Sequence, residues 1–252
     1  MSNMNLWVFS MSKKLVAIAL IGLIIIIMAG AFAPRPRPQA KEIPLSEEEI
    51  ESILVLHVID ESDKEATEVE EAPPEPINYP PVNMTKVSFG TDQGYLYIKI
   101  EVLGELPTEK DDPVTEITIC VLMDTDGNDS SGWHGYDALV GFYITWDPLG
   151  KYNIEVYITY NIATTLDEEE AFKNADYISG EYKGGPGKNY VVLRVSMELL
   201  GLESGQEVVM DIHAEAESEE YHHYAFDALM SSQYNYTGTG NYFWHSVKIP
   251  IT

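Results

Sequence analysis

The chain has 252 residues, of which 45% are hydrophobic, and this suits one domain of about 150 to 200 residues with appendages. Forty-one acidic residues against fifteen basic ones give a net charge of -26, which excludes nucleic acid and anionic lipid headgroups as partners. The single cysteine, Cys120, excludes a disulfide framework and a cysteine-based zinc site.

The first predicted element is the uncharged apolar stretch from Leu15 to Ala33. At about 1.5 Å per residue, a helix of this length spans a hydrocarbon core. Basic residues flank the stretch on both sides, so the flanking charges do not determine its orientation. Its N-terminal, signal-like position and the acidic bulk that follows favour a single-pass protein of the cell membrane. We therefore expect residues 1–14 in the cytoplasm and the bulk of the chain outside.

Three glycosylation sequons, at Asn83, Asn128 and Asn235, agree with this orientation. Ala31–Ala33 has the small-x-small form of a cleavage site, but Pro34 follows it and the apolar run is longer than an ordinary signal core. The sequence thus favours a retained anchor over a cleaved signal peptide. A pilin-like leader, cut just before the apolar run, stays a minor option.

Residues 34–83 are predicted to form a stalk and linker rich in proline and glutamate. Within them, Ser46 and Glu49 have the spacing of a capping box, which predicts the start of a helix. The following run ILVLHVI is rich in β-branched residues and is equally typical of a strand. Both interpretations of residues 46–60 stay open.

Residues 84–252 show period-two alternation in short segments separated by turn-forming residues, which predicts strands. The candidate strands are residues 95–102, 116–124, 138–146, 152–160, 190–197, 208–217 and 242–251. Short helices are expected at 166–175 and at 197–201, before Gly201. Seven strands without long helices between them indicate an all-β fold, an antiparallel β-sandwich of immunoglobulin or jelly-roll type.

The alternation assigns the two faces of each strand. Leu96 and Ile98 are expected in the core, whereas Tyr97 and Lys99 are expected in water. In the same way, the segment 208–217 is expected to expose Asp211, His213, Glu215 and Glu217.

The segment from Asp124 to Asp137, DTDGNDSSGWHGYD, joins two of these strands. Asp124, Asp126 and Asn128 stand at the first, third and fifth positions of an EF-hand loop. The sixth position lacks glycine, the twelfth lacks glutamate and strands flank the segment, so an EF-hand is excluded.

A calcium loop between strands remains, with Asp124, Asp126, Asn128 and Asp137 as the predicted ligands, because Ca²⁺ prefers hard oxygen donors. The alternative is an ordinary acidic turn held by hydrogen bonds from side chain to backbone. Crowded carboxylates without a nearby Lys or Arg favour a bound cation.

The order VLMDTDGNDSSGW, GYDALVGFYI and YVVLRVSMELLGL resembles the DOMON-like superfamily, especially family 9 carbohydrate-binding modules and their archaeal cell-surface relatives. The resemblance covers residues 84–251. It implies an extracellular β-sandwich, often stabilised by calcium, that binds sugars. Some relatives hold haem through Met and His, but nothing in the spacing of Met123 and His213 singles them out, so no haem is expected.

Aromatic side chains near the loop and near the C-terminus are candidates for stacking on sugar rings, although packing within the sheet is the alternative. The predicted ligand contacts are Trp133, Tyr136, Tyr234, Tyr236, Tyr242 and Trp244. The histidines His213, His222, His223 and His245 are interpreted as surface or edge residues rather than as a metal site.

No nucleophile elbow, phosphate loop or zinc-protease motif occurs in the sequence, so we expect no catalysis. The sequence predicts a membrane-anchored extracytoplasmic module that binds a glycan or surface polymer. The alternative is a structural subunit of a surface layer, a pilus-like filament or a membrane complex, whose partners are other surface proteins.

Overall fold

The computed structural model describes residues 40–60, 77–147, 149–165, 168–173, 175–221, 224–229, 236–239 and 242–249. The side chains of residues 168, 169, 236–239 and 242–246 are not described. The described residues belong to one compact unit, Pro38–Thr252. Within them no helix is long and apolar enough to cross a membrane, and the apolar stretch at 15–33 lies outside them.

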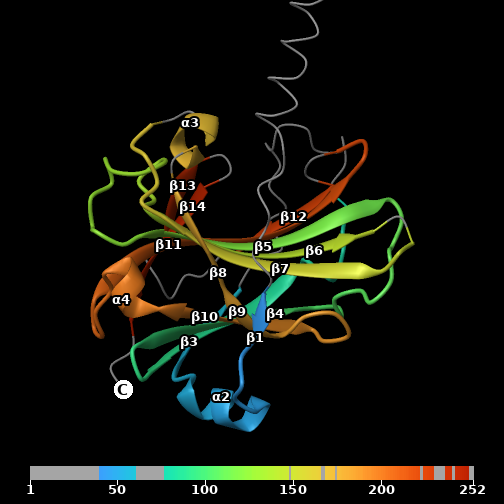
Figure 1. Cartoon of the computed structure of the whole chain (residues 1–252), viewed down its shortest axis with the longest axis horizontal. Helices are drawn as coiled ribbons and strands as arrows, with labels where there is room; N and C mark the ends of the chain where they lie inside the picture. Colours follow the sequence, from blue (N-terminus) through green and yellow to red (C-terminus); the bar gives the residue numbers. More distant parts are fainter. Residues whose placement is uncertain are drawn as a thin grey trace, which may run out of the picture. The chain divides into compact units, whose positions relative to one another are not determined.

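Two sheets lie one above the other in this unit (Figure 1). The six-stranded sheet has the order β1 (Lys41–Glu42), β9 (Glu181–Gly184), β10 (Tyr190–Ser196), β4 (Tyr95–Val102), β3 (Met84–Asp92) and β2 (Leu56–Ile59). The eight-stranded sheet has the order β13 (Tyr236–Thr239), β14 (Tyr242–Lys248), β11 (Glu207–Ser218), β5 (Val114–Asp124), β6 (Ala138–Trp146), β7 (Tyr152–Tyr160) and β8 (Asp176–Ser179). Its remaining strand, β12 (Ala225–Ala228), pairs with β11. All these pairings are antiparallel except that of β1 with β9, so the predicted all-β fold of two antiparallel-rich sheets is confirmed.

All seven predicted strands are present, and the strands at 95–102, 138–146 and 152–160 have the predicted ends. Both short helices are also confirmed, as α3 (Glu168–Phe172) and α4 (Met197–Leu200), with Gly201 in the left-handed conformation that ends α4. Six strands were not predicted: the nine-residue β3 and the short strands β1, β8, β9, β12 and β13, none longer than four residues. For β3 the alternation was not recognised, because buried residues occupy consecutive positions along most of the strand. Segments as short as the other five show too little alternation to stand out in the sequence.

Residues 46–60 contain both of the elements that the sequence left open. Ser46 and Glu49 form the capping box of α2 (Glu47–Ile53), and β2 follows and pairs with β3. Together with β1, these elements belong to the sandwich, although the sequence placed them in a stalk and linker.

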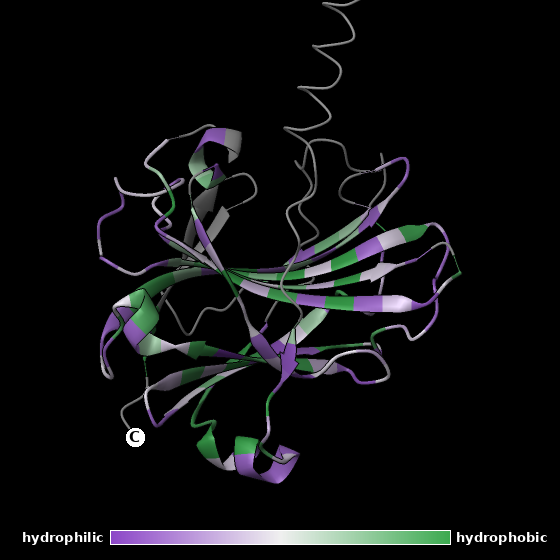
Figure 2. Ribbon diagram, in the orientation of Figure 1, coloured by the Kyte–Doolittle hydropathy of each residue, from purple (hydrophilic) through white to green (hydrophobic). Residues whose placement is uncertain are grey.

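The interior between the sheets is formed by one face of every long strand. Hydrophobic and hydrophilic bands alternate along the strands (Figure 2). Phe142 of β6 is fully buried, and its ring lies 5.7 Å from the ring of Tyr182 on β9, so it joins the two sheets. Burial of these apolar faces supplies most of the stabilisation of such a fold.

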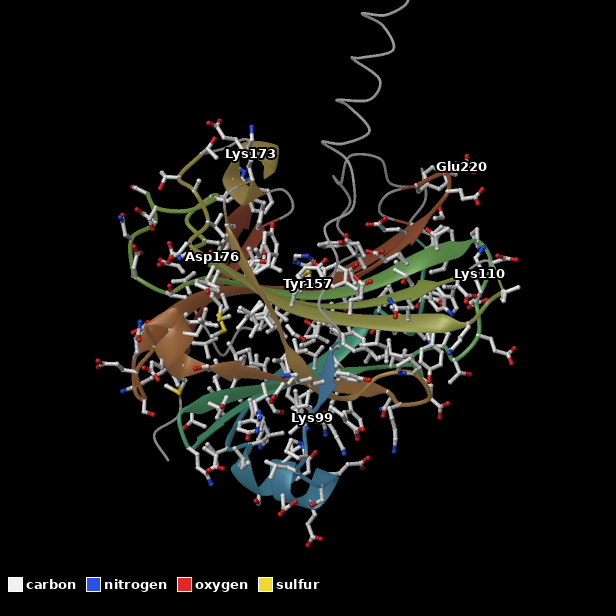
Figure 3. The ribbon with its side chains drawn as sticks, in the orientation of Figure 1. Lys99, Lys110, Tyr157, Lys173, Asp176 and Glu220 are labelled. Carbon is white, nitrogen blue, oxygen red and sulfur yellow. The ribbon has the colours of Figure 1, made fainter. Side chains whose placement is uncertain are left out.

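The second face of the six-stranded sheet is not in water, contrary to the prediction for Tyr97 and Lys99. Tyr97 is buried in a second small core with Ile50 of α2, which packs across this face. Lys99 lies between the sheet and α2 (Figure 3), forms ion pairs with Glu51 and Glu101, and stacks over a tyrosine ring. The alternation located the strands correctly, but it carries no information about a helix that covers the outer face.

Candidate functional site

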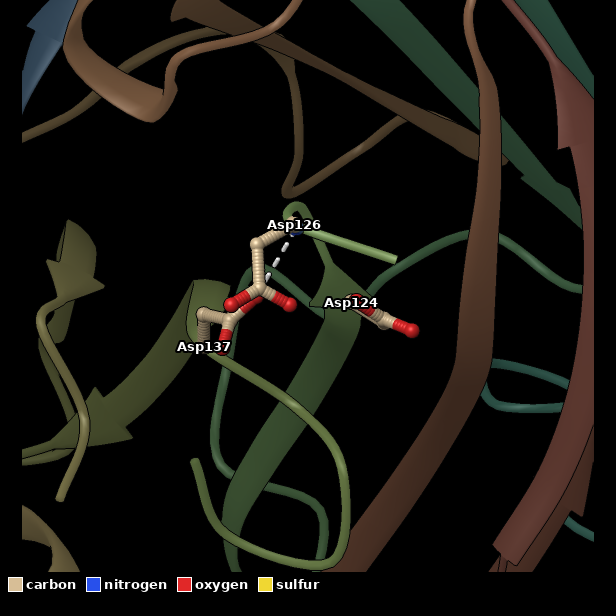
Figure 4. A group of neighbouring side chains, drawn as sticks. All are labelled: Asp124, Asp126 and Asp137. Carbon is tan, nitrogen blue, oxygen red and sulfur yellow. Dashed lines mark hydrogen bonds between the residues drawn. The ribbon is translucent and has the colours of Figure 1, made fainter. Parts of the chain in front are cut away.

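The predicted calcium loop is the best-defined cluster of carboxylates among the described residues. Asp124 ends β5, and Asp137 immediately precedes β6, the neighbouring strand, so their side chains meet at one end of the eight-stranded sheet. Asp126 lies in the connecting loop. One ligand oxygen from each of the three carboxylates lies within 4.8 Å of the other two (Figure 4).

Asp137 holds the loop in place. Its Oδ2 accepts hydrogen bonds from the backbone amides of Thr125 at 2.8 Å and Asp126 at 3.2 Å, and from the hydroxyl of Thr125. Its Oδ1 accepts a hydrogen bond from the hydroxyl of Ser131 at 2.9 Å. Gly132 is required in the same loop, because a Cβ there would lie 1.9 Å from the carbonyl oxygen of Tyr136.

Asp124 and Asp126 accept backbone hydrogen bonds in turn. Oδ1 of Asp124 accepts from the amides of Gly127 at 2.7 Å and Asn128 at 3.2 Å, and Oδ1 of Asp126 accepts from Asn128 at 2.8 Å. The side-chain oxygen of Asn128 accepts from the amide of Ser130. Asn128 therefore contributes its side chain to a turn, whereas the three predicted aspartates converge.

The electrostatics of this loop are unfavourable for three negative charges. Burial raises the pKa of Asp124, and the charges of Asp137 and Asp126 raise it further, against the lowering effect of the Gly127 and Asn128 amides. Asp124 is 7% exposed, so water screens its charge poorly. Hard oxygen donors in this arrangement suit Ca²⁺, which would remove the repulsion between the carboxylates.

Asp124→Asn tests this repulsion, since the amide oxygen still accepts hydrogen bonds but carries no charge. With chelator present, the native state binds the Asp124 proton more tightly than the unfolded state does. The stability of the unmodified chain therefore falls as the pH rises from about 3.9 through the raised pKa. We expect the variant to equal it in free energy of unfolding at about pH 3 and to exceed it at about pH 7. Urea unfolding at both values measures this, and a variant less stable at neutral pH would contradict it.

The predicted aromatic ligand contacts near the loop pack inside the protein. Tyr136 is 1% exposed, so its ring has no face to offer to a sugar. Trp133 is partly buried and lies edge-on to Phe172 of α3 at 5.5 Å. Tyr234 lies outside the described residues, and of Tyr236, Tyr242 and Trp244 only the backbone is described.

A different aromatic group lies on the outer face of the eight-stranded sheet, the face turned away from the six-stranded sheet. Tyr143 of β6 stacks on Tyr157 of β7 with ring centroids 4.5 Å apart, and Tyr157 meets Tyr177 of β8 edge-on at 6.4 Å. These three residues form what we call the tyrosine ladder, and Tyr157 is labelled on this face in Figure 3. Gly141 makes room for it, because a Cβ there would lie 2.3 Å from the ring of Tyr143.

The histidines on the described strands differ from the prediction in one case. His213 was expected at the surface, yet its side chain is 15% exposed and stacks on Phe226 of β12 at 5.5 Å. Burial lowers its pKa, but hydrogen bonding and charge from Asp211 and Cys120 outweigh burial, so its pKa is raised well above the usual value. His222 and His223 lie outside the described residues, and of His245 only the backbone is described.

The remaining predicted sites are the sequons. Asn128 is exposed, Asn83 is half-buried and Asn235 lies outside the described residues. Comparison with protein-family models and with curated proteins found no match for this chain.

Proposed function

We propose that this chain is a non-catalytic, extracytoplasmic binding module for neutral carbohydrate, anchored in the cell membrane through residues 15–33. The observation that supports it is the tyrosine ladder, which crosses three neighbouring strands, β6, β7 and β8, at one edge of a sheet. The ladder holds the ring of Tyr177 in place, and this ring is 39% exposed and offers apolar surface with a polar tip. That combination suits sugar rings, which have apolar faces and hydroxyl edges.

The charge of the chain restricts the ligand. A net charge of -26 repels acidic polysaccharides, so neutral glycans or neutral surface polymers are the expected class. Polar side chains lie beside the ladder on the same face, among them Glu155 of β7 opposite Tyr143 and Asn153, whose amide donates a hydrogen bond to Glu155. Carboxylate and amide groups at the edge of an aromatic surface form hydrogen bonds with sugar hydroxyls.

The predicted calcium loop, residues 124–137, has a supporting role in this proposal. It lies at the junction of β5 and β6, and β6 provides Tyr143 and Gly141. A Ca²⁺ ion at Asp124, Asp126 and Asp137 would stabilise this junction without contacting the glycan.

A glycan array with the full-length protein in detergent tests the proposal. We expect retention of neutral glycans, and we expect Tyr177→Ala to weaken binding about tenfold, which corresponds to roughly 1.4 kcal/mol. Tyr152→Ala is the matched control, because Tyr152 and Tyr177 are each 39% exposed but Tyr152 is not part of the ladder. Equal binding by both variants, or no retained glycan, would remove the carbohydrate assignment.

A second candidate function is assembly into a surface structure. Among the described residues, β2 is an edge of the six-stranded sheet; Ile59 at its end is 46% exposed, and Val55 just before it is 58% exposed. Exposed sheet edges with apolar side chains favour pairing with another chain. Light scattering distinguishes the two functions. Assembly requires that the protein forms oligomers, and we expect Ile59→Lys to disrupt them.

A further inference from the structure

A hollow of about 390 Å³ lies between two loops at one end of the eight-stranded sheet. One loop, residues 103–113, leads into β5, and the other begins at Glu219, directly after β11. The ends of these two strands are partners across the sheet, so the loops leave it side by side. We call this hollow the acidic cleft, and Figure 3 labels Lys110 and Glu220, one from each loop, at this end of the molecule.

Carboxylates from both loops line the acidic cleft. Asp112 belongs to the first loop, and Glu219 and Glu220 belong to the second. Among the described residues that line the cleft, Lys110 is the one with a basic side chain. One ammonium group against three carboxylates leaves two negative charges unbalanced at neutral pH, so the cleft favours a ligand with two positive charges.

The cleft already holds one alkylammonium group, that of Lys110. Its Nζ lies 2.9 Å from Oδ1 of Asp112. The hydrogen bond and the charge of Asp112 raise the pKa of Lys110, and the charge of Glu219 on the other loop raises it further. The side chains of Lys110 and Asp112 are 37% and 82% exposed, so water screens this pair and a second cation can compete for the carboxylate. The protein's own side chain therefore shows the kind of cation that the cleft accommodates.

Hydrogen bonds hold the second loop in a fixed turn. The amide of Tyr221 donates to the hydroxyl of Ser218 at 2.9 Å, and the amide of Ser218 donates to the carbonyl oxygen of Tyr221 at 2.9 Å. Glu219 and Glu220 are the two central residues of this turn. Their carboxylates therefore stand at the rim of the cleft without a cost for ordering the chain when a ligand binds.

Rings form the apolar part of the wall, which includes Pro113, Tyr221 and Tyr224. Tyr224 is anchored, because it is half-buried, packs against the main core and meets Tyr79 edge-on at 6.4 Å. Aromatic rings attract cations and also pack against methylene groups. The wall thus offers apolar contact between the carboxylates of the two loops.

This arrangement differs from that of a metal site. Among the described residues, the group of carboxylates with ligand atoms within 4.8 Å of one another is the aspartate triad of the predicted calcium loop, and the carboxylates of the cleft do not converge in this way. Carboxylates on two sides of an apolar wall suit an elongated cation with charged ends. A volume of about 390 Å³ is also near the lower limit of small-molecule pockets, which is about 300 Å³.

We infer that the acidic cleft binds linear aliphatic diamines, with one ammonium group at Asp112 and the other at Glu219 and Glu220. The methylene chain lies against the rings between them. The net charge of -26 attracts cations to the whole surface, and the spacing of the carboxylates selects diamines from among them. Binding here is independent of the glycan surface and of the calcium loop, so each assignment can fail without the others.

Isothermal titration calorimetry tests the inference, with the full-length protein in uncharged detergent and 1,5-diaminopentane as the probe. We expect saturable binding of one diamine per chain. Pentylamine, which has the same carbon chain and a single charge, should bind at least about tenfold more weakly. Equal affinity for the two amines, or uptake of diamine without saturation, would overturn the inference.

A pair of charge-matched variants locates the site. Glu219→Gln removes one carboxylate of the cleft but keeps its shape, and we expect it to weaken diamine binding about tenfold. Asp126→Asn is the matched control, because it removes one negative charge from the predicted calcium loop and should bind the diamine as the unmodified protein does. Equal losses in both variants would show attraction by overall charge only and would overturn the site.

A variant with a gain in affinity tests the role of Lys110. Lys110→Met removes the ammonium group that competes for Asp112, so we expect the diamine to bind at least about threefold more tightly. Lys41→Met is the control, because Lys41 is exposed on β1 of the other sheet and should leave the affinity unchanged. Unchanged or weaker binding in Lys110→Met would overturn the placement of an ammonium group at Asp112.

Discussion

Millimolar calcium is expected to raise the melting temperature of this protein, and chelator is expected to lower it. An ion that binds only the native state adds RT ln(1 + [L]/Kd), which is about 2.7 kcal/mol at a hundredfold excess over Kd. Magnesium should substitute poorly, because it requires a smaller, nearly octahedral set of ligands and gives up water reluctantly. Thermal melts monitored by circular dichroism with calcium, magnesium and chelator measure the effect.

A pair of variants separates ion binding from the structure of the turn. Asp126→Asn removes one charge of the triad but keeps an oxygen that can accept from the Asn128 amide and the Ser131 hydroxyl. Asp129→Asn removes an exposed charge from the same loop but outside the triad. We expect the first variant to lose most of the calcium response and the second to keep it. A protein indifferent to calcium and chelator would have an acidic turn here and no ion site.

Much of this site was predictable because its members are close in the sequence. Asp124 ends one predicted strand and Asp137 immediately precedes the next, and these two strands pair directly. The positions of the predicted strands were therefore enough to predict that the two side chains are neighbours. The role of Asn128 was not predictable, because its side-chain oxygen can either bind a cation or accept a hydrogen bond from the backbone of a turn. In the structure it accepts a hydrogen bond from the amide of Ser130. Only the folded loop shows which backbone amides are left for it.

The neighbours on the outer face of the eight-stranded sheet could not be predicted from the sequence, for a different reason. Cys120 and His213 are partners only because β5 pairs with β11, far along the chain. The alternation places each residue on a face, but the register between distant strands decides which residues are neighbours. The alternation predicted that the polar face of this strand lies in water. The burial of Asp211 and His213 on that face was therefore not predicted.

Adjacent residues of a strand lie on opposite faces of its sheet. We therefore expect substitutions on the inner face to lower stability and substitutions on the outer face to weaken glycan binding. Phe142 is fully buried between the sheets, where its ring packs against Tyr182 and lies over Gly185. Phe142→Ala removes this contact and leaves a cavity, which we expect to cost about 3–5 kcal/mol of unfolding free energy. Urea unfolding of the full-length protein measures the loss.

Tyr177→Ala is the matched comparison, since it removes an aromatic ring that is 39% exposed on the outer face. We expect it to cost less than about 1 kcal/mol of stability, as is usual for exposed positions, while it weakens glycan binding. Phe142→Ala should show the reverse pattern and bind glycan normally at temperatures where it stays folded, because its side chain does not reach the tyrosine ladder. Equal losses of stability in the two variants would contradict the division of labour between the faces. Loss of glycan binding in the folded Phe142→Ala protein would show instead that the binding surface depends on the packing between the sheets.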